Sequence, residues 1–168
     1  MSVQSANELV ATDRRAGKYL TFILSEEGYG LEILKVREII GMMAITAIPR
    51  MPDYVKGVIN LRGKVIPVID LRLKFGMCKS EQTSETCIIV VDVGGSLMGV
   101  VVDQVSEVIE IRGADIEDPP QVGVNVDTGF ILGMGKTKDS VKILLDIDKV
   151  LSDSDIADLK IVSATETA

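Results

Sequence analysis

Two pairs of carboxylates are the side chains in this sequence that are best placed to do acid–base chemistry. Glu26 adjoins Glu27, and Asp146 stands two positions before Asp148. Paired carboxyl groups can act as general acid and base in hydrolysis. Turns and helix starts also favour acids, however, and the first pair falls in an expected turn and the second at an expected helix start. Because the chain has no histidine, it lacks the commonest general base, and we interpret both pairs as structural.

The cysteines and glycines offer no better catalytic or metal site. Cys78 and Cys87 are too few for a disulfide scaffold, their spacing matches no CxxC motif, and a zinc ion without histidine ligands would need carboxylates. The chain contains no phosphate-binding glycine motif and no nucleophile elbow, and Gly133-Met-Gly135 is expected to be hairpin geometry. We therefore expect a non-enzymatic protein with no catalytic residues, no metal and no cofactor, which works by binding.

The charge and hydrophobicity of the chain narrow the class of partner. Its 168 residues carry a net charge of −7, whereas nucleic acids and anionic membranes are bound through clustered Lys and Arg. No run approaches the ~18 apolar residues that span a bilayer, and the polar residues 1–17, an expected flexible tail, lack the apolar centre of a signal peptide. We expect a cytoplasmic protein that binds other proteins, with no nucleic-acid partner and no direct membrane insertion.

Short apolar runs separated by turn residues predict an all-β fold. Turn signals recur about every 8–12 residues, which is typical of a sandwich or barrel. Short helices are expected at 146–151 and 154–162, and the irregular stretch 113–127 is long enough to be a functional loop. The expected strands are 18–24, 29–34, 36–40, 55–61, 64–69, 87–93, 97–102, 106–111, 130–134 and 141–145.

An internal repeat indicates that the domain arose by duplication. Residues 30–40 align without gaps to 99–109, and residues 65–71 align to 141–147, with Gly, Val, Glu and Asp matched in the same order. Each copy holds about five strands, enough for a small barrel. We expect one barrel at about 18–79 and another at about 85–151, which share an apolar interface because each is small. Ile69 and Ile143 are expected in the core, where truncation to Ala would cost about 2–5 kcal/mol.

Two polar residues stand out as candidate contacts with a partner. Strict alternation puts Val36, Glu38 and Ile40 on one face of a strand, and a mixture of apolar and charged groups suits an interface. An ordinary strand with a charge at its exposed end would look the same, so both interpretations stay open. Arg62, at the turn of the hairpin 55–69, is either a solvated turn residue or a cation that binds a partner carboxylate bidentately.

This hairpin carries a family resemblance. GVINLRGKVIPVIDLR, preceded by ITAIPRMPDYVKGV, resembles the bacterial chemotaxis coupling proteins of the CheW family, and GVVVDQVSEVIEI is similar to their matching segment. The resemblance covers about residues 18–151. It implies a CheW-like domain over 18–152, built as two small five-stranded SH3-like barrels around a shared hydrophobic core with short peripheral helices, followed by a C-terminal helix and tail at 153–168.

The resemblance also implies partners and site residues. Proteins of this family link the cytoplasmic tips of methyl-accepting chemotaxis receptors to the regulatory domain of the histidine kinase CheA. Val36 and Glu38 would face the kinase, and Arg62, Val105 and Val108 would lie near the groove that takes the receptor's helical hairpin. Because strict alternation places Val105 and Val108 on opposite faces, their shared site requires a bulge.

Three alternatives stay open from the sequence. The closest is a coupling or regulatory domain of a CheV-type or CheA-like protein that acts outside flagellar chemotaxis. A second is a lipoyl or biotinyl carrier domain, although Lys64 lies between Gly63 and Val65 and lacks the neighbours that such a modified lysine needs. The third is an unrecognised enzyme, which the missing histidine disfavours.

Overall fold

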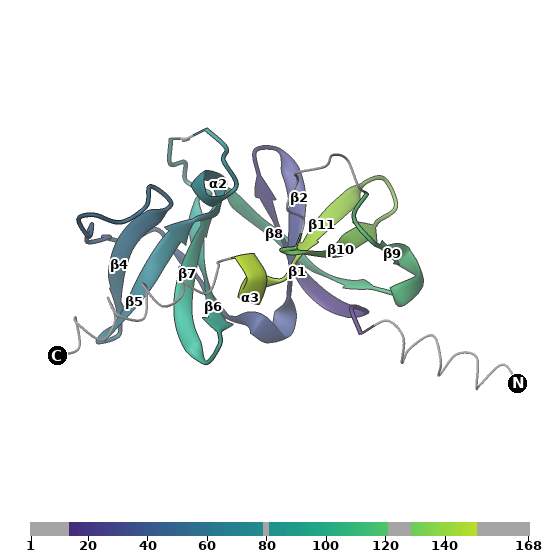
Figure 1. The fold of residues 1–168 in the computed structure, drawn as a ribbon, viewed down its shortest axis with the longest axis horizontal. Helices are drawn as coiled ribbons and strands as arrows, with labels where there is room; N and C mark the ends of the chain where they lie inside the picture. The colour runs from purple at the N-terminus through teal and green to yellow at the C-terminus, as the bar shows by residue number, and fades with distance from the viewer. Residues whose placement is uncertain (1–13, 79–80, 121–128, 151–168) are drawn as a thin grey trace, which may run out of the picture.

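The computed structural model describes residues 14–78, 81–120 and 129–150 and contains two small β-barrels side by side (Figure 1). One is a curled six-stranded sheet with the order β8-β1-β2-β11-β10-β9, and we call it the terminal barrel because its strands come from both ends of the described chain. Its strands are β1 (Gly17–Leu24), β2 (Glu27–Glu32), β8 (Gln104–Ile111), β9 (Ile116–Glu117), β10 (Ile131–Lys136) and β11 (Val141–Leu145).

The other barrel, the central barrel, is a five-stranded sheet with the order β3-β6-β7-β5-β4. Its strands are β3 (Val36–Gly41), β4 (Val55–Leu61), β5 (Lys64–Asp70), β6 (Cys87–Val93) and β7 (Ser96–Val102). Short helical turns connect the strands: η1 (Ile33–Lys35), α2 (Leu71–Lys74), η2 (Gly113–Asp115) and α3 (Ile147–Val150). The all-β fold of two small barrels is as expected, with the two-residue β9 as a sixth strand in the terminal barrel.

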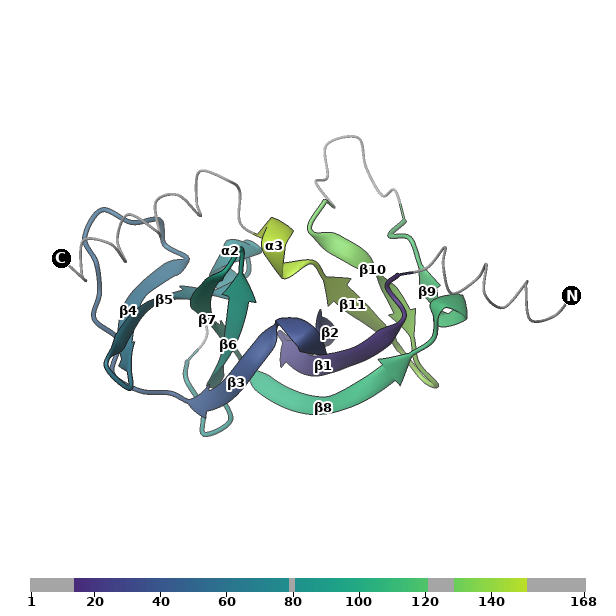
Figure 2. The same cartoon turned by 90° about the horizontal axis from the view of Figure 1, so that it is seen from below.

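The strand order corrects the expected division into consecutive barrels at 18–79 and 85–151. The central barrel is one continuous stretch, residues 36–102, whereas the terminal barrel combines residues 17–32 with residues 104–145. The chain crosses between the barrels at η1 and again at Asp103 (Figure 2). Each repeat therefore contributes its N-terminal hairpin to one barrel and its last strands to the other.

The strand register confirms the duplication. In the terminal barrel Gly30 pairs with Leu144 between parallel strands, and in the central barrel Gly99 pairs with Val68 in the same way. The repeat offsets convert one pair into the other, since 30 plus 69 is 99 and 144 minus 76 is 68. The bulges of β4 and β10 also lie 76 positions apart.

Contacts with the terminal barrel begin before residue 18, where the domain was expected to start. Residue 14 is the first that the structure describes, and Arg15 is held on the terminal barrel. Its Nη1 donates to the Leu132 carbonyl at 3.2 Å and to Asp118 Oδ1 at 2.9 Å, and the Tyr19 hydroxyl donates to the Arg15 carbonyl. Residues 14–17 therefore do not belong to a free tail, whereas the rest of the expected tail, residues 1–13, and the predicted segment 153–168 lie outside the described residues.

Apolar side chains form one core between the barrels and one inside each. In β6, Ile89 and Val91 face the core between the barrels, whereas Ile88 and Val90 face the inside of the central barrel. The core between the barrels draws on both of them, which explains why neither is an independent unit. Its buried residues include Leu20, Phe22, Leu24, Tyr29, Leu31 and Leu145 from the terminal barrel and Ile69, Leu71, Ile89, Val91, Met98 and Val100 from the central barrel.

Candidate functional site

Two equivalent edge strands carry most of the predicted site residues. β3 lies at one edge of the central sheet and β8 at one edge of the terminal sheet. The repeat relates them with an offset of 69, and each leaves one large apolar side chain in solvent, Ile39 at 45% exposure and Val108 at 49%. Monomeric surfaces tolerate single exposed apolar residues, but matched ones on two sheet edges point to a binding surface.

A bulge in β3 separates Val36 from Glu38 and overturns the expectation that they share a face. Val36 pairs with Val91 and Glu38 pairs with Val90, so Arg37 is the extra residue. Residues that pair across antiparallel strands point to the same side of the sheet. Val36 therefore lies on the face of the sheet that, with Val91, covers the core between the barrels. Glu38 lies on the opposite face, the one from which Val90 points into the central barrel.

β8 contains the bulge that is needed to put Val105 and Val108 on the same face. Val105 pairs with Phe22 and Val108 with Leu20, and the register shifts between them. Since Phe22 and Leu20 both belong to the core between the barrels, Val105 and Val108 lie on one face of the sheet. The expectation of a shared Val105 and Val108 surface is therefore structurally possible, because one extra residue restores the alternation.

Four side chains thus face the line where the barrels meet, and we call Val36, Ile39, Val105 and Val108 the seam patch. Val36 and Val105 are half-buried against the core between the barrels, and Ile39 and Val108 are exposed. Their strands lie on the same side of the molecule (Figure 2). Ile39 was missed from sequence, although the offset of 69 that relates it to Val108 could have revealed it.

Arg62 is bound to Glu38 within the chain. The turn between β4 and β5 places Arg62 at φ 51° and Gly63 at φ 87°, and Asn60 Oδ1 accepts a hydrogen bond from the Gly63 N–H at 2.8 Å. Both Arg62 Nη atoms donate to the two Glu38 carboxylate oxygens. The structure therefore joins Arg62, expected on the receptor side, to Glu38, expected on the kinase side, and both lie on a different sheet from Val105 and Val108.

This ion pair makes a testable prediction about pKa. The hydrogen bond from Arg62 lowers the pKa of Glu38, so the pair's contribution to stability is present above the unfolded-state value of about 4.3 and is lost as pH falls through the folded-state pKa. In Arg62→Gln we expect the Glu38 pKa to rise toward its ordinary value, as followed by NMR of the carboxyl carbon. Lys64→Gln, in the same hairpin, should leave it unchanged, and an unmoved Glu38 pKa in Arg62→Gln would disprove the pairing in solution.

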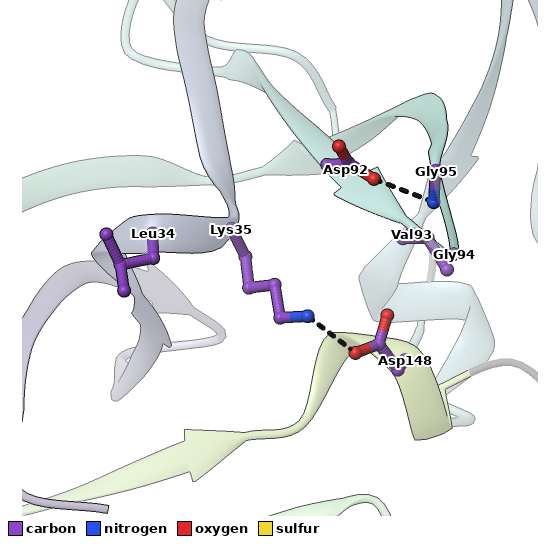
Figure 3. A pocket seen from close by; sticks show the side chains of 7 residues that line it. All are labelled: Leu34, Lys35, Asp92, Val93, Gly94, Gly95 and Asp148. Carbon is purple, nitrogen blue, oxygen red and sulfur yellow. Dashed lines mark hydrogen bonds and ion pairs between the residues drawn. The ribbon is translucent and has the colours of Figure 1, made fainter.

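A hollow of about 380 Å³ lies at the crossover between the barrels, next to η1 (Figure 3). Each of its charged side chains has an ion-pair partner within the chain, although Asp148 Oδ1 is buried and has no hydrogen-bond partner among the described residues. Lys35 Nζ donates to Asp148 Oδ2 at 2.8 Å, and Asp92 accepts from Arg37 at 2.7 Å and from the Gly95 N–H at 2.9 Å. The hollow is therefore best explained as part of the connection between the barrels.

The residues first considered for chemistry have structural roles. Asp146 Oδ1 accepts a hydrogen bond from the Asp148 N–H at 3.1 Å at the start of α3, and Glu26 lies in the turn of the hairpin β1–β2 at φ 73°. Burial raises the pKa of the Cys87 thiol, which leaves it a weak nucleophile. Within the described ranges no cluster of three or more potential ligands could hold a metal ion. No helix in those ranges is long and apolar enough to cross a membrane.

These features define a two-barrel binding protein, and the comparisons with known proteins agree. The model of the CheW-like domain matches residues 18–155. The chain is 40% identical to the chemotaxis protein CheW of Klebsiella aerogenes over 140 residues, covering 83% of this chain and 84% of that protein. It is 34% identical to the CheW of Helicobacter pylori over 134 residues, covering 80% of this chain and 81% of that protein.

A solved structure of the same family is also similar to this chain. The scaffolding protein TtCheW from Thermoanaerobacter tengcongensis superposes with a TM-score of 0.76 at 41% identity, covering 83% of this chain and 95% of that one. The chain belongs to the CheW-like family. It is a chemotaxis adaptor of that family and not an enzyme.

Proposed function

We propose that this adaptor couples methyl-accepting chemotaxis receptors to the histidine kinase CheA in the cytoplasm, at receptor arrays in the membrane. The observation that carries the proposal is the seam patch, an apolar surface formed jointly by both barrels, with the Glu38–Arg62 ion pair on the other face of the same edge strand, β3. An apolar centre with a charged rim is the usual composition of a protein–protein interface.

The seam patch is the proposed site for the receptor's helical hairpin. A helix binds in a groove through apolar residues spaced three or four positions apart. Val105 and Val108 share the face that this requires, and Val36 and Ile39 lie on the equivalent face of β3. We therefore assign Val36 to the receptor side together with Val105 and Val108, instead of to the kinase side.

Glu38 and Arg62 are the proposed polar link to the kinase side. Glu38 turns away from the seam patch, toward the side of the central barrel, where Arg62 holds it. The kinase's regulatory domain has, by family resemblance, the same barrel fold, so contact between like barrels is expected. Coupling would then be a shift between populations: the adaptor must bind the two signalling states of the array with different affinity.

Arg62→Ala tests this assignment. We expect Arg62→Ala to weaken binding of the CheA regulatory domain about tenfold, equivalent to ~1.4 kcal/mol, because truncation of an interface arginine commonly costs more than ~1 kcal/mol of binding free energy. The thermal midpoint should stay nearly unchanged, since surface ion pairs contribute little to stability. Binding is measured by titration calorimetry with a CheA regulatory domain and, separately, with a receptor cytoplasmic fragment.

The matched control is Lys64→Ala, which removes an exposed cation from the same hairpin. It should bind both partners like the unmodified protein. If the unmodified protein binds neither partner, the coupling function is wrong. If Arg62→Ala unfolds the protein, or binds both partners normally, Arg62 has no role in partner binding of the kind proposed.

A further inference from the structure

An ion pair holds each of the two places where the chain crosses between the barrels. At the first crossing Lys35 Nζ, at the end of η1, donates to Asp148 Oδ2 in α3 at 2.8 Å. At the second crossing Asp103 Oδ2 accepts from Arg72 Nη1 in α2 at 2.5 Å. In both cases the helical turn follows the strand that runs parallel to the strand before the crossing, since α3 follows β11 beside β2, and α2 follows β5 beside β7. Each ion pair therefore joins a crossing to the strand beside which the chain leaves its barrel.

The repeat relates the two ion pairs to each other, but their polarity is opposite. Subtracting 76 from 148 gives 72, so the same position of the helical turn is acidic in α3 and basic in α2. At the crossings, subtracting 69 from 103 gives 34, the neighbour of Lys35, and there the charges are reversed as well. A single polarity would have formed an ion pair at both crossings equally well, so the reversal must act on something other than the strength of each pair.

The reversal distinguishes between the two ways in which the repeats can fold. In consecutive barrels, β2 would run beside β5 of its own repeat, and β7 beside β11. The first crossing would then bring Lys35 beside Arg72, and the second would bring Asp103 beside Asp148, so like charges would meet at both. The observed exchange brings opposite charges together at both crossings. The residue that caps each helical turn is an aspartate in both repeats and does not discriminate.

The burial of these side chains strengthens the discrimination. The side chain of Arg72 is 15% exposed and that of Asp103 is 30% exposed, and Asp103 also accepts from the Ser25 N–H at 2.9 Å. Lys35 and Asp148 are more open, at 37% and 41%. Charges in partly buried places are screened less by water and salt than charges on an open surface. Repulsion at both crossings therefore disfavours consecutive barrels.

We infer that the opposite polarity of the two crossing ion pairs selects the exchanged arrangement of the repeats over consecutive barrels. The positioning residues are Lys35, Arg72, Asp103 and Asp148. The exchange ties the barrels together at two crossings, whereas consecutive barrels would be joined by a single linker after α2. The same charges thus help to hold β3 and β8, which carry the seam patch, at a fixed spacing. No partner is needed for this selection, so it stands apart from the proposed coupling function.

A turn swap, Arg72→Asp with Asp148→Arg, tests the selection without changing the composition or the net charge of the chain. It puts like charges at both crossings of the exchanged protein and opposite charges at both crossings of consecutive barrels. The matched control is a full swap, which adds Lys35→Asp and Asp103→Lys and restores opposite charges in the exchanged protein. If each residue acted only through its own local contacts, the full swap would disturb the protein more than the turn swap.

NMR contacts of Gly30 report which arrangement forms. A Cβ atom at Gly30 would stand 2.9 Å from Leu144 Cδ2, and one at the counterpart Gly99 would stand 3.3 Å from Val68 Cγ2. Contacts of the Gly30 α-protons with the Leu144 methyl groups therefore mark the exchange, and contacts with the Val68 methyl groups mark consecutive barrels.

After refolding from urea, the unmodified protein and the full swap are expected to show only the Leu144 contact. The turn swap should show the Val68 contact as well, because reversal at two crossings shifts the ratio of the two arrangements by about a hundredfold or more. A turn swap that folds with the Leu144 contact alone overturns the inference. So does a full swap in which the Val68 contact is as strong as in the turn swap.

A milder pair of variants decides the matter if the turn swap does not fold. Arg72→Gln with Asp148→Asn removes both charges, and Arg72→Lys with Asp148→Glu keeps them. We expect the neutral variant to refold at least about threefold more slowly, because chains that first pair consecutively must come apart before the repeats exchange. The variant that keeps the charges should refold like the unmodified protein. Equal refolding rates of the two variants, followed by circular dichroism, would contradict the selection.

Discussion

Replacing Gly57 by alanine is expected to cost the protein about 4 kcal/mol or more of its stability, a large part of the ~5–15 kcal/mol typical of a folded domain. Gly57 lies at the bulge of β4 with φ at +140°, a conformation that other residues rarely adopt. A Cβ atom there would stand 2.0 Å from the Thr46 carbonyl oxygen. The same carbonyl accepts the Val58 N–H at 2.9 Å, and the Thr46 N–H donates to the Val58 carbonyl at 2.8 Å. Relief of the clash therefore breaks the pair of hydrogen bonds that joins the segment around Thr46 to Val58 in β4.

Gly63→Ala is the matched control for this prediction. Gly63 also has a positive φ, +87°, but a Cβ atom there meets nothing within 4 Å. Its substitution carries only the backbone strain, of order 1–3 kcal/mol. Urea unfolding followed by circular dichroism gives both values. Equal losses in the two variants would show that φ, and not the approach of Thr46, makes Gly57 necessary.

Much of the fold was predictable from local pattern, and the strand exchange was not. The strands 87–93 and 55–61 and the hairpin turn at Arg62-Gly63 follow from apolar runs and turn residues. The repeat followed from matched Gly and Asp positions. Local patterns do not say whether a hairpin pairs with its own repeat or with the other one, because the cross-strand contacts are equivalent in both cases. Only the two crossovers, at η1 and Asp103, decide it.

The site was predictable in composition but not in orientation. Val36, Glu38, Arg62, Val105 and Val108 were all selected from sequence, and the structure places each on or beside an edge strand or turn. A period of two fails wherever a strand contains one extra residue. That single residue moves Val36 away from Glu38 and brings Val105 and Val108 together, and neither bulge contains a glycine or other signal that would reveal it.

Truncating Ile69 to alanine is expected to cost about 2–5 kcal/mol, the usual loss for a fully buried branched side chain. Ile69 has no solvent exposure and lies in the core between the barrels, where β5 runs parallel to β7. From sequence Ile143 was expected to behave in the same way. It is only half-buried, at the margin of that core, so Ile143→Ala should cost about 1–2 kcal/mol.

Chemical unfolding of the two variants decides between a joint core and two separate ones. Because Ile69 packs in the core that both barrels share, its truncation should lower the midpoint of a single transition seen equally by probes in either barrel. An unchanged denaturant slope would show that the native surface stays the same. Two transitions in Ile69→Ala, with only the central barrel destabilised, would mean that the core between the barrels does not bind them into one cooperative unit. Seam-patch residues on β3 and β8 keep a fixed spacing only if that unit holds, so a split transition would also weaken the case for a site built across both barrels.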